Sequence, residues 1–302
     1  MPITAEAAIR DRMRGSIDRA GANERCGARA MMRIAAVLVS VLVCGYAQAA
    51  DRFITLSSTT STQDSGLFGH ILPIFKAATG IDVHVVAVGT GQALAIGQRG
   101  DADALLVHDR RGEDKFVAEG YGIDRRDVMY NDFVIVGPKA DPAHIRGLNN
   151  AGKALRRIAA AEAPFASRGD DSGTNRMEVR LWKSFSIHLP DPHSGWYRDV
   201  GQGMGATLNI AAAMNAYTLT DRATWTNFKN RRDLEILTEG DPVLFNPYGS
   251  ILVNPAKWPK VKIGDARTWH EWLTSKAGLA AITSYKINGE ELFFPPRRQA
   301  AH

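Results

Sequence analysis

From residue 53 onward, short apolar stretches alternate with stretches whose apolar residues recur at helical spacing. Residues 53–56, 81–88 and 104–107 are apolar and β-branched and are typical of buried strands. Helical patterns follow the first two of these strands and end near Gly80 and Gly100. Because a β-α-β-α-β order requires crossover connections, it predicts a parallel sheet covered by helices, which is an α/β fold.

The alternation stops at a long apolar segment and then begins again, which indicates two domains. Residues 128–136 and 248–253 are strand-like and flank a second α/β unit, whose first helix is predicted over 143–160. We expect domain I to comprise 50–134 and 247–302, with domain II, 135–246, inserted between two crossover strands. Such a two-lobed protein closes around a ligand by hinge motion, and ligands lie beyond the carboxyl ends of the strands.

The first 49 residues have the pattern of a leader that contains a signal peptide. Met31, Met32 and Arg33 begin a short basic region, residues 34–44 are apolar, and Ala47-Gln48-Ala49 has the small-residue spacing of a cleavage site. The apolar run is shorter than the roughly 20 residues needed to span a bilayer. We therefore expect translation to start at Met31 or Met32, cleavage near Ala49-Ala50, and a periplasmic mature protein.

The basic character of the full chain belongs mostly to this leader. The chain has 37 Lys and Arg against 32 Asp and Glu. The first 50 residues hold seven of the former and four of the latter, which leaves 30 and 28. The charge of the mature chain therefore gives no indication of nucleic-acid binding. Both cysteines, Cys26 and Cys44, also lie in the leader.

Three loops that follow predicted strands are rich in hydrogen-bond donors and indicate an anion site. They begin at Ser58, Gly89 and Arg168. Freed backbone N–H groups at helix N-termini and hydroxyl groups donate to anions, and an arginine adds a charged fork of donors. The predicted donors are Thr59, Thr60, Ser61, Thr90, Arg168 and Ser172, with Gly91, Asp170, Asp171 and Thr174 as possible supporting residues.

The predicted donor set favours a fully deprotonated dianion such as sulfate, molybdate or tungstate. Such an ion accepts hydrogen bonds on every side, whereas hydrogen phosphate carries a proton and benefits from a carboxylate. Asp170 and Asp171 are the residues on which this choice depends. We expect them to orient Arg168 or to cap the next helix, and an inward carboxylate would favour phosphate.

Other chemistry finds weaker support in the sequence. Residues 89–94 and 201–206 imitate a dinucleotide fingerprint, with Asp109 and Asp221 at the expected distance, but the first has Leu94 at a position that requires a small residue. The second follows residues 196–200, which form a poor strand pattern. The sequence has no close pair of histidines that would predict a metal site, and it has no G-x-S-x-G motif that would predict a hydrolase. We expect no catalytic residues and no cofactor, with a nicotinamide-dependent oxidoreductase as the alternative from another class.

Seven motifs in one order closely resemble the tungstate-binding periplasmic proteins of tungstate ABC transporters. They are residues 58–66, 88–91, 100–108, 130–138, 167–174, 201–205 and 217–222. The resemblance implies a type II periplasmic-binding-protein fold, and a monomer that captures tungstate, and molybdate more weakly, for a membrane permease. The family's oxyanion motif falls on Ser58, Thr59, Thr60 and Ser61, and its oxyanion arginine on Arg168. Ser58 departs from the threonine that is commoner in the family. A phosphate- or sulfate-binding protein of the same fold remains an alternative.

Overall fold

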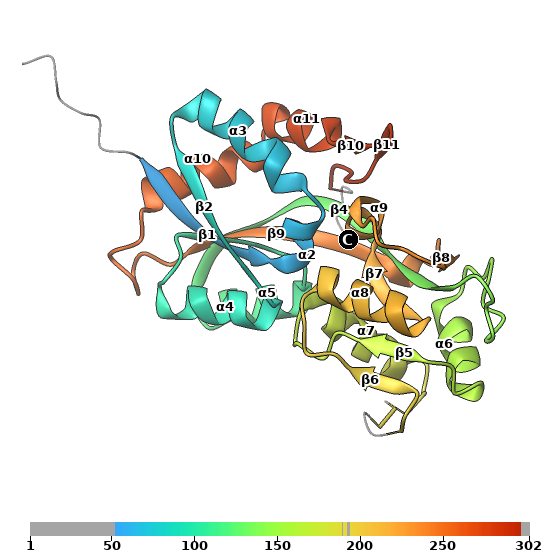
Figure 1. Ribbon diagram of the computed structural model, residues 1–302. Coiled ribbons are helices and arrows are strands. Elements are labelled where there is room, and N and C mark those ends of the chain that lie inside the picture. The colour runs from blue at the N-terminus through green and yellow to red at the C-terminus, as the bar shows by residue number, and fades with distance from the viewer. Residues whose placement is uncertain (1–51, 189, 192–193, 297–302) are drawn as a thin grey trace, which may run out of the picture. The chain divides into compact units, whose positions relative to one another are not determined.

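The computed structural model describes residues 52–188, 190–191 and 194–296, which all belong to one compact unit (Figure 1). The predicted leader and its cleavage site, residues 1–49, lie outside the described residues. The described unit is built on one seven-stranded mixed sheet in the order β2-β1-β3-β9-β4-β7, with β8 also paired to β4. Two further pairs of strands, β5 with β6 and β10 with β11, form separate ladders.

The first half of the sheet is the predicted β-α-β-α-β unit. Its strands β1 (Phe53–Thr59), β2 (Asp82–Val88) and β3 (Ala104–Val107) pair in parallel, with β1 in the middle. The connecting helices are α2 (Thr60–Asp64), α3 (Leu67–Thr79) and α4 (Thr90–Arg99), and α5 (Arg110–Ala118) follows β3. In Figure 1, α3 covers one face of these strands, and α4 and α5 cover the other.

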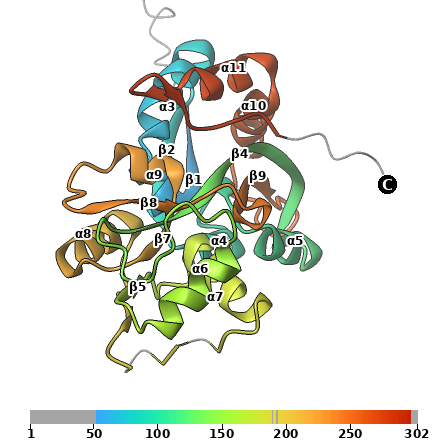
Figure 2. The ribbon, with the colours of Figure 1, turned by 90° about the vertical axis from the view of Figure 1, so that its right-hand side faces the viewer.

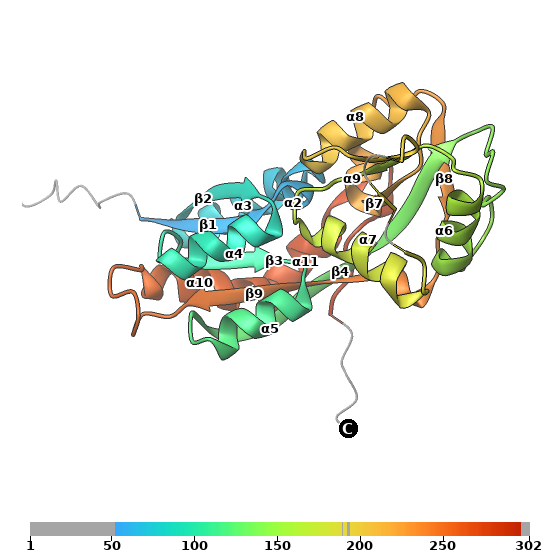
Figure 3. The same cartoon turned by 90° about the horizontal axis from the view of Figure 1, so that it is seen from below.

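Two long strands continue this sheet into the second half of the unit. They are β4 (Gly122–Pro138) and β9 (Phe245–Val253), which run antiparallel to each other. The first part of β4 pairs with β9, whereas its last residues pair with β7 and β8. Figure 3 shows both strands passing from the group around β1 toward the group around α7.

The inserted segment forms the second group of elements. Its strands are β5 (Phe165–Ser167), β6 (Tyr197–Asp199), β7 (Thr218–Asp221) and β8 (Leu234–Thr238). Its helices are α6 (Ala151–Ala160), α7 (Gly173–Ser184), α8 (Met204–Met214), α9 (Arg222–Asn227) and the short 3-10 helix η1 (Pro242–Leu244). The chain then returns through β9 to α10 (Ile263–Thr274), α11 (Lys276–Ser284), β10 (Lys286–Ile287) and β11 (Glu290–Glu291).

The apolar cores separate along the same line. One pair of clusters packs α3, α10 and α11 on one face of β1 and β3, and α4 and α5 on the other. A second pair of clusters lies around β5 and the far end of β4, between α6, α7 and α8. Figure 2 shows α6, α7 and α8 together on the side away from α10 and α11. We call these two groups lobe I and lobe II, and the boundaries near residues 134 and 247 remain a prediction.

Two local expectations were wrong. The helix predicted over 143–160 begins only at Ala151, because Asn150 caps it and His144 has a positive φ of 52°. Residues 197–199, dismissed as a poor strand, form β6, since they pair in parallel with β5. Tyr197 is buried there, and its two polar neighbours face outward.

Candidate functional site

Arg168 is a buried cation whose hydrogen-bonding capacity is only partly used. It follows β5 directly, and the residue is 1% exposed. Its Nη2 donates to Asp170 Oδ2 at 2.5 Å and to Thr60 Oγ1 at 3.0 Å. Its Nε and Nη1 are buried and have no partner among the residues that the structure describes. Because buried donors are nearly always satisfied, these two atoms indicate a place for an acceptor.

Four helix N-termini contact one another in pairs at this junction, and one of them, that of α2, contacts Arg168. Thr60 begins α2 and contacts Arg168, and Thr90 begins α4. The first N–H of α7, from Gly173, donates to Thr90 Oγ1 at 2.6 Å. Gly203, which precedes α8, packs so closely that a Cβ atom there would lie 3.4 Å from the Thr60 side chain. The positive ends of the helix dipoles and the free N–H groups of first turns both favour a bound anion.

Three hydroxyl groups near Arg168 each keep a hydrogen that they can donate. Thr60 Oγ1 accepts from Arg168, and Thr90 Oγ1 accepts from the N–H of Gly173. Ser172 Oγ accepts the capping hydrogen bond at the start of α7. A hydroxyl group carries one hydrogen and two lone pairs, so accepting a bond leaves its hydrogen free. These groups can therefore act as donors to the same ligand as the arginine.

The other hydroxyl groups of the β1 motif are engaged within the fold. Ser58 Oγ donates to the carbonyl of Leu106 at 2.6 Å, so its hydrogen is already used. Thr59 is the N-cap of α2. Ser61 Oγ and Thr59 Oγ1 both reach Nε2 of His108, at 2.9 and 3.2 Å. The predicted set of hydroxyls therefore divides into groups with a free hydrogen and groups that hold the motif in shape.

The two aspartates on which the choice of anion depends are both held by arginines. Asp170 accepts from Arg168 and from the N–H of Ser172, at 3.2 Å. Asp171 forms a two-pronged ion pair with Arg176, and its side chain is 67% exposed. Asp170 thus contacts Arg168, as an orienting residue would, and its role in the site stays a prediction. Asp171 does not cap α7, because Ser172 takes that position.

The remaining supporting residues lie at the same junction. The N–H of Gly91 donates to the carbonyl of Asp171 at 3.2 Å, which ties the start of α4 to the loop before α7. A Cβ atom at Gly91 would lie 2.0 Å from Asp171 Oδ2, so a larger residue there would require the Asp171 side chain to move. Thr174 Oγ1 is buried and has no partner among the described side chains and backbone. Thr174 is thus a further hydroxyl with donating capacity.

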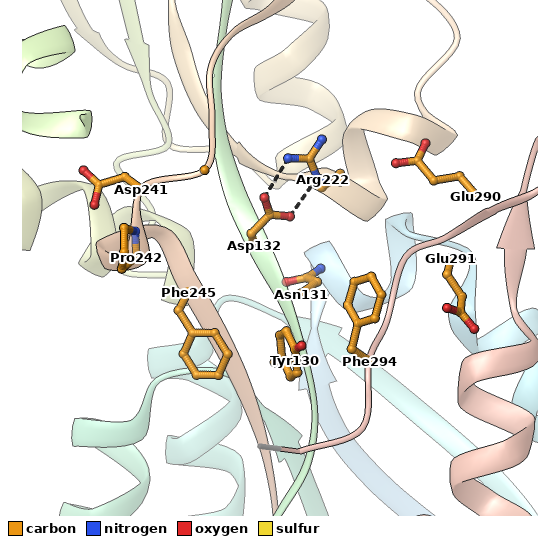
Figure 4. Close-up of a pocket in the computed structure, with 11 residues that line it drawn as sticks. Tyr130, Asn131, Asp132, Arg222, Asp241, Pro242, Phe245, Glu290, Glu291 and Phe294 are labelled. Atoms are coloured by element: carbon orange, nitrogen blue, oxygen red, sulfur yellow. Dashed lines mark hydrogen bonds and ion pairs between the residues drawn. The ribbon is translucent and has the colours of Figure 1, made fainter. Parts of the chain in front are cut away.

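A cavity of about 420 Å³ has a lining of different chemistry (Figure 4). Its arginine, Arg222, is paired with Asp132 through two hydrogen bonds and with Glu239. The lining residues are Tyr130, Asn131, Asp132, Arg222, Gly240, Asp241, Pro242, Phe245, Glu290, Glu291 and Phe294. This cavity carries more acidic than basic side chains, so it does not suit an anion.

Comparison with known proteins shows the family to which the chain belongs. Residues 45–277 match the model of the PBP superfamily domain. The tungstate-binding protein TupA of Peptoclostridium acidaminophilum is 45% identical over 246 residues, which cover 80% of this chain and 85% of that protein. The chain belongs to the family of tungstate-binding periplasmic proteins.

Solved structures of the family show the same fold. The tungstate ABC transporter protein from Geobacter sulfurreducens is 50% identical, with a TM-score of 0.71 over 78% of this chain and 100% of that one. TupA from Desulfovibrio alaskensis G20 is 45% identical, with a TM-score of 0.68 over 81% of this chain and 99% of that one. The two-lobed type II periplasmic-binding-protein fold predicted from the resemblance is therefore confirmed, and the oxidoreductase alternative is not favoured.

The structure also brings to this family's site residues that the sequence did not single out. His108 and Asp221 are buried beside the junction, and Asn131 and Asn246 lie between them. Burial, together with the charge of Arg168, lowers the pKa of His108 to about 4. Burial raises the pKa of Asp221 to about 6, although Thr224 and Arg168 oppose the shift. The sequence signal was slight, because it consisted only of the places of the two residues: His108 directly follows β3, and Asp221 is the last residue of β7.

Other kinds of site find no support in the described part of the chain. Within it, no cluster of three or more His, Cys, Asp or Glu side chains could hold a metal ion. None of its helices is both long enough and apolar enough to cross a membrane.

Proposed function

We propose that this protein is an exported substrate-binding protein that captures tungstate, and molybdate more weakly, and delivers it to an ABC importer. The observation that carries the proposal is the buried Arg168, whose Nε and Nη1 lack partners beside hydroxyl groups with free hydrogens. The names of the relatives supply the identity of the anion. The proposed donors to the ligand are Thr60, Thr90, Arg168 and Ser172, with Gly91, Asp170, Asp171 and Thr174 in support, while Ser58, Thr59 and Ser61 hold the shape of the β1 motif.

Binding in this proposal is completed by contact between the lobes. Thr60 and Thr90 belong to lobe I, whereas Arg168 and Gly173 belong to lobe II, and hydrogen bonds of 3.0 and 2.6 Å join the two sides. A dianion placed between them neutralises Arg168 and receives donors from both sides. Because this interaction is available only when the lobes meet, the anion favours the closed form over an open one.

The engagement of both aspartates supports a fully deprotonated anion over hydrogen phosphate. Hydrogen phosphate needs an acceptor for its proton. Asp170 already accepts from Arg168 and the loop backbone, and Asp171 is turned toward Arg176 and solvent. Both carboxylates are thus engaged within the fold, Asp170 by Arg168 and the loop backbone and Asp171 by Arg176, which supports a site for dianions.

Calorimetric titration of residues 50–302 with tungstate, molybdate, sulfate and phosphate tests the proposal. We expect tungstate to bind most tightly, molybdate next, and phosphate not measurably. If phosphate bound and tungstate did not, the site would belong to the phosphate- or sulfate-binding alternative. If sulfate bound most tightly, the proposal of a dianion site would stand, and the proposal that the protein serves a tungstate importer would fail.

The setting of the protein is part of the same proposal. We infer a periplasmic, monomeric protein that is released by cleavage near Ala49-Ala50 and docks on a membrane permease. Domain I would comprise 50–134 and 247–302, and domain II 135–246. Mass spectrometry of the secreted protein measures the first residue, and light scattering measures the oligomeric state.

A further inference from the structure

A chain of buried side chains leads from α9 to the anion site. Asn131 Nδ2 donates to Asp221 Oδ1 at 3.3 Å, and Asn246 Nδ2 donates to Asn131 Oδ1 at 2.6 Å. Nδ1 of His108 lies 3.1 Å from Asn246 Oδ1, and its Nε2 lies 2.9 Å from Ser61 Oγ. Each of these residues is at most 4% exposed. We call Asp221, Asn131, Asn246 and His108 the relay.

The charge of Asp221 fixes the direction of every hydrogen bond in the relay. An ionised carboxylate only accepts, so Asn131 must present its NH₂ group to Asp221 and its oxygen to Asn246. Asn246 then presents its own oxygen to His108, which must carry its hydrogen on Nδ1. A neutral imidazole with hydrogen on Nδ1 has a bare Nε2, which can only accept.

Ser61 is the nearest donor to that bare nitrogen. Thr59 Oγ1 lies farther from His108 Nε2, at 3.2 Å, and has Thr62 Oγ1 at 2.7 Å as a closer partner. We propose that His108 is a positioning residue of the anion site. Its Nε2 accepts the hydrogen bond of the Ser61 hydroxyl group, so Thr60 and Thr90 are the hydroxyl donors of lobe I. This inference rests on the proposed function, because it assigns roles within the same site.

Charged groups around His108 keep the ring neutral. Burial and the charges of Arg168 and Arg180 lower its pKa, whereas its contact with Asn246 and the charge of Asp109 raise it, and the pKa falls to about 4. The relay also joins the strands that connect the lobes, since Asn131 lies in β4 and Asn246 in β9. The direction of the Ser61 hydroxyl is therefore set from outside its own loop.

Nitrogen-15 NMR of the full mature chain tests the relay without any ligand. We expect the His108 ring to show hydrogen on Nδ1 and a bare Nε2 throughout pH 7–8, with the signal assigned by its loss in His108→Gln. A ring with hydrogen on Nε2, or a charged ring in this range, would overturn the proposal. A histidine that merely fills space has no reason to adopt this tautomer.

Calorimetry with tungstate then tests the roles of the hydroxyls. We expect Ser61→Ala to change the affinity by less than about threefold, and Thr60→Val to weaken it by roughly tenfold or more, as for loss of one hydrogen bond to a charged group. An equal or larger loss in Ser61→Ala would overturn the proposal, because Ser61 would then be a donor to the anion. If the unchanged protein bound none of the four anions, the proposed function would fail, while the NMR result would still decide the relay.

Discussion

Two arginines, Arg168 and Arg222, occupy similar positions and have opposite surroundings. Each follows the last residue of a strand of lobe II, β5 or β7. Arg222 donates hydrogen bonds to two carboxylates, that of Asp132 at 2.7 and 2.8 Å and that of Glu239 at 2.6 Å. Arg168 donates to one carboxylate, that of Asp170, and has two buried nitrogens without a partner in the described chain. Only Arg168 has a charge and donors left for a ligand.

Cavity volume would indicate a ligand site at Arg222, whereas the unsatisfied donors indicate one at Arg168. Arg222 borders the cavity of about 420 Å³, and its acidic neighbours in Figure 4 include Asp132, Asp241 and Glu290. Arg168 lies at a junction where the lobes already contact one another. A small oxyanion needs converging donors more than volume, so the identity of unsatisfied groups is the better guide to its site.

The largest expected effect is the loss of anion binding when Arg168 is removed. Arg168→Ala should weaken tungstate binding by about 2–5 kcal/mol, because the ligand loses its charge-assisted partner. Arg222→Ala is the matched control, and its affinity should stay close to that of the unchanged protein. Calorimetric titration of both variants measures the difference. Equal losses would show that the distinction between the two arginines has no bearing on binding.

The carboxylate of Asp221, the residue before Arg222, should make the stability of the fold depend on pH. Burial raises the pKa of Asp221 to about 6, so the folded state binds its proton more tightly than the unfolded state does. Its contribution to stability is therefore complete below about pH 4 and is lost as the pH rises toward 6.

The substitution Asp221→Asn tests this pH dependence. It removes the ionisable group, and asparagine can still cap a helix N-terminus. Between about pH 4 and 6, the free energy of unfolding of the variant should gain roughly 1–3 kcal/mol relative to the unchanged protein. Urea unfolding at several pH values measures the gain, and Asp132→Asn serves as the control. A constant difference across this range would mean that Asp221 ionises normally.

A smaller effect separates the hydroxyls with a free hydrogen from those that hold the fold. Thr90→Val should reduce tungstate affinity by about 1–1.5 kcal/mol, the value of one hydrogen bond. Ser58→Ala should leave affinity nearly unchanged, because Ser58 donates to the carbonyl of Leu106, and should lower the unfolding temperature instead. The reverse pattern, with Ser58 important for binding and Thr90 not, would contradict the assignment of donors.

The smallest effect is expected at the saturated arginine. The ion pair between Arg222 and Asp132 is partly exposed, with side chains 20% and 31% accessible. Asp132→Asn should therefore cost less than about 1 kcal/mol of stability and leave tungstate affinity unchanged. Chemical unfolding and calorimetry measure the two quantities. A loss of anion affinity here would place this cavity in the binding process after all.

The sequence predicted the fold class and the types of residue in the candidate site, because both depend on local patterns. Apolar periodicity specified β1, β2 and β3 and their helices. Local patterns failed where a contact with another segment decided the outcome. Residues 197–199 form a strand because β5 lies beside them, and the segment before Ala151 is not helical, since Gly147 and Leu148 pair with β8.

The sequence by itself placed donor residues and an arginine at strand ends, and the tertiary structure decided which of those donors are available. Whether a hydroxyl keeps its hydrogen depends on partners far away in the chain. Leu106 lies 48 residues from Ser58, and Arg168 lies 108 residues from Thr60. His108 acquires a role only through Asn246, 138 residues away. Hydrogen-bond direction is a property of these long-range contacts, and no local pattern encodes it.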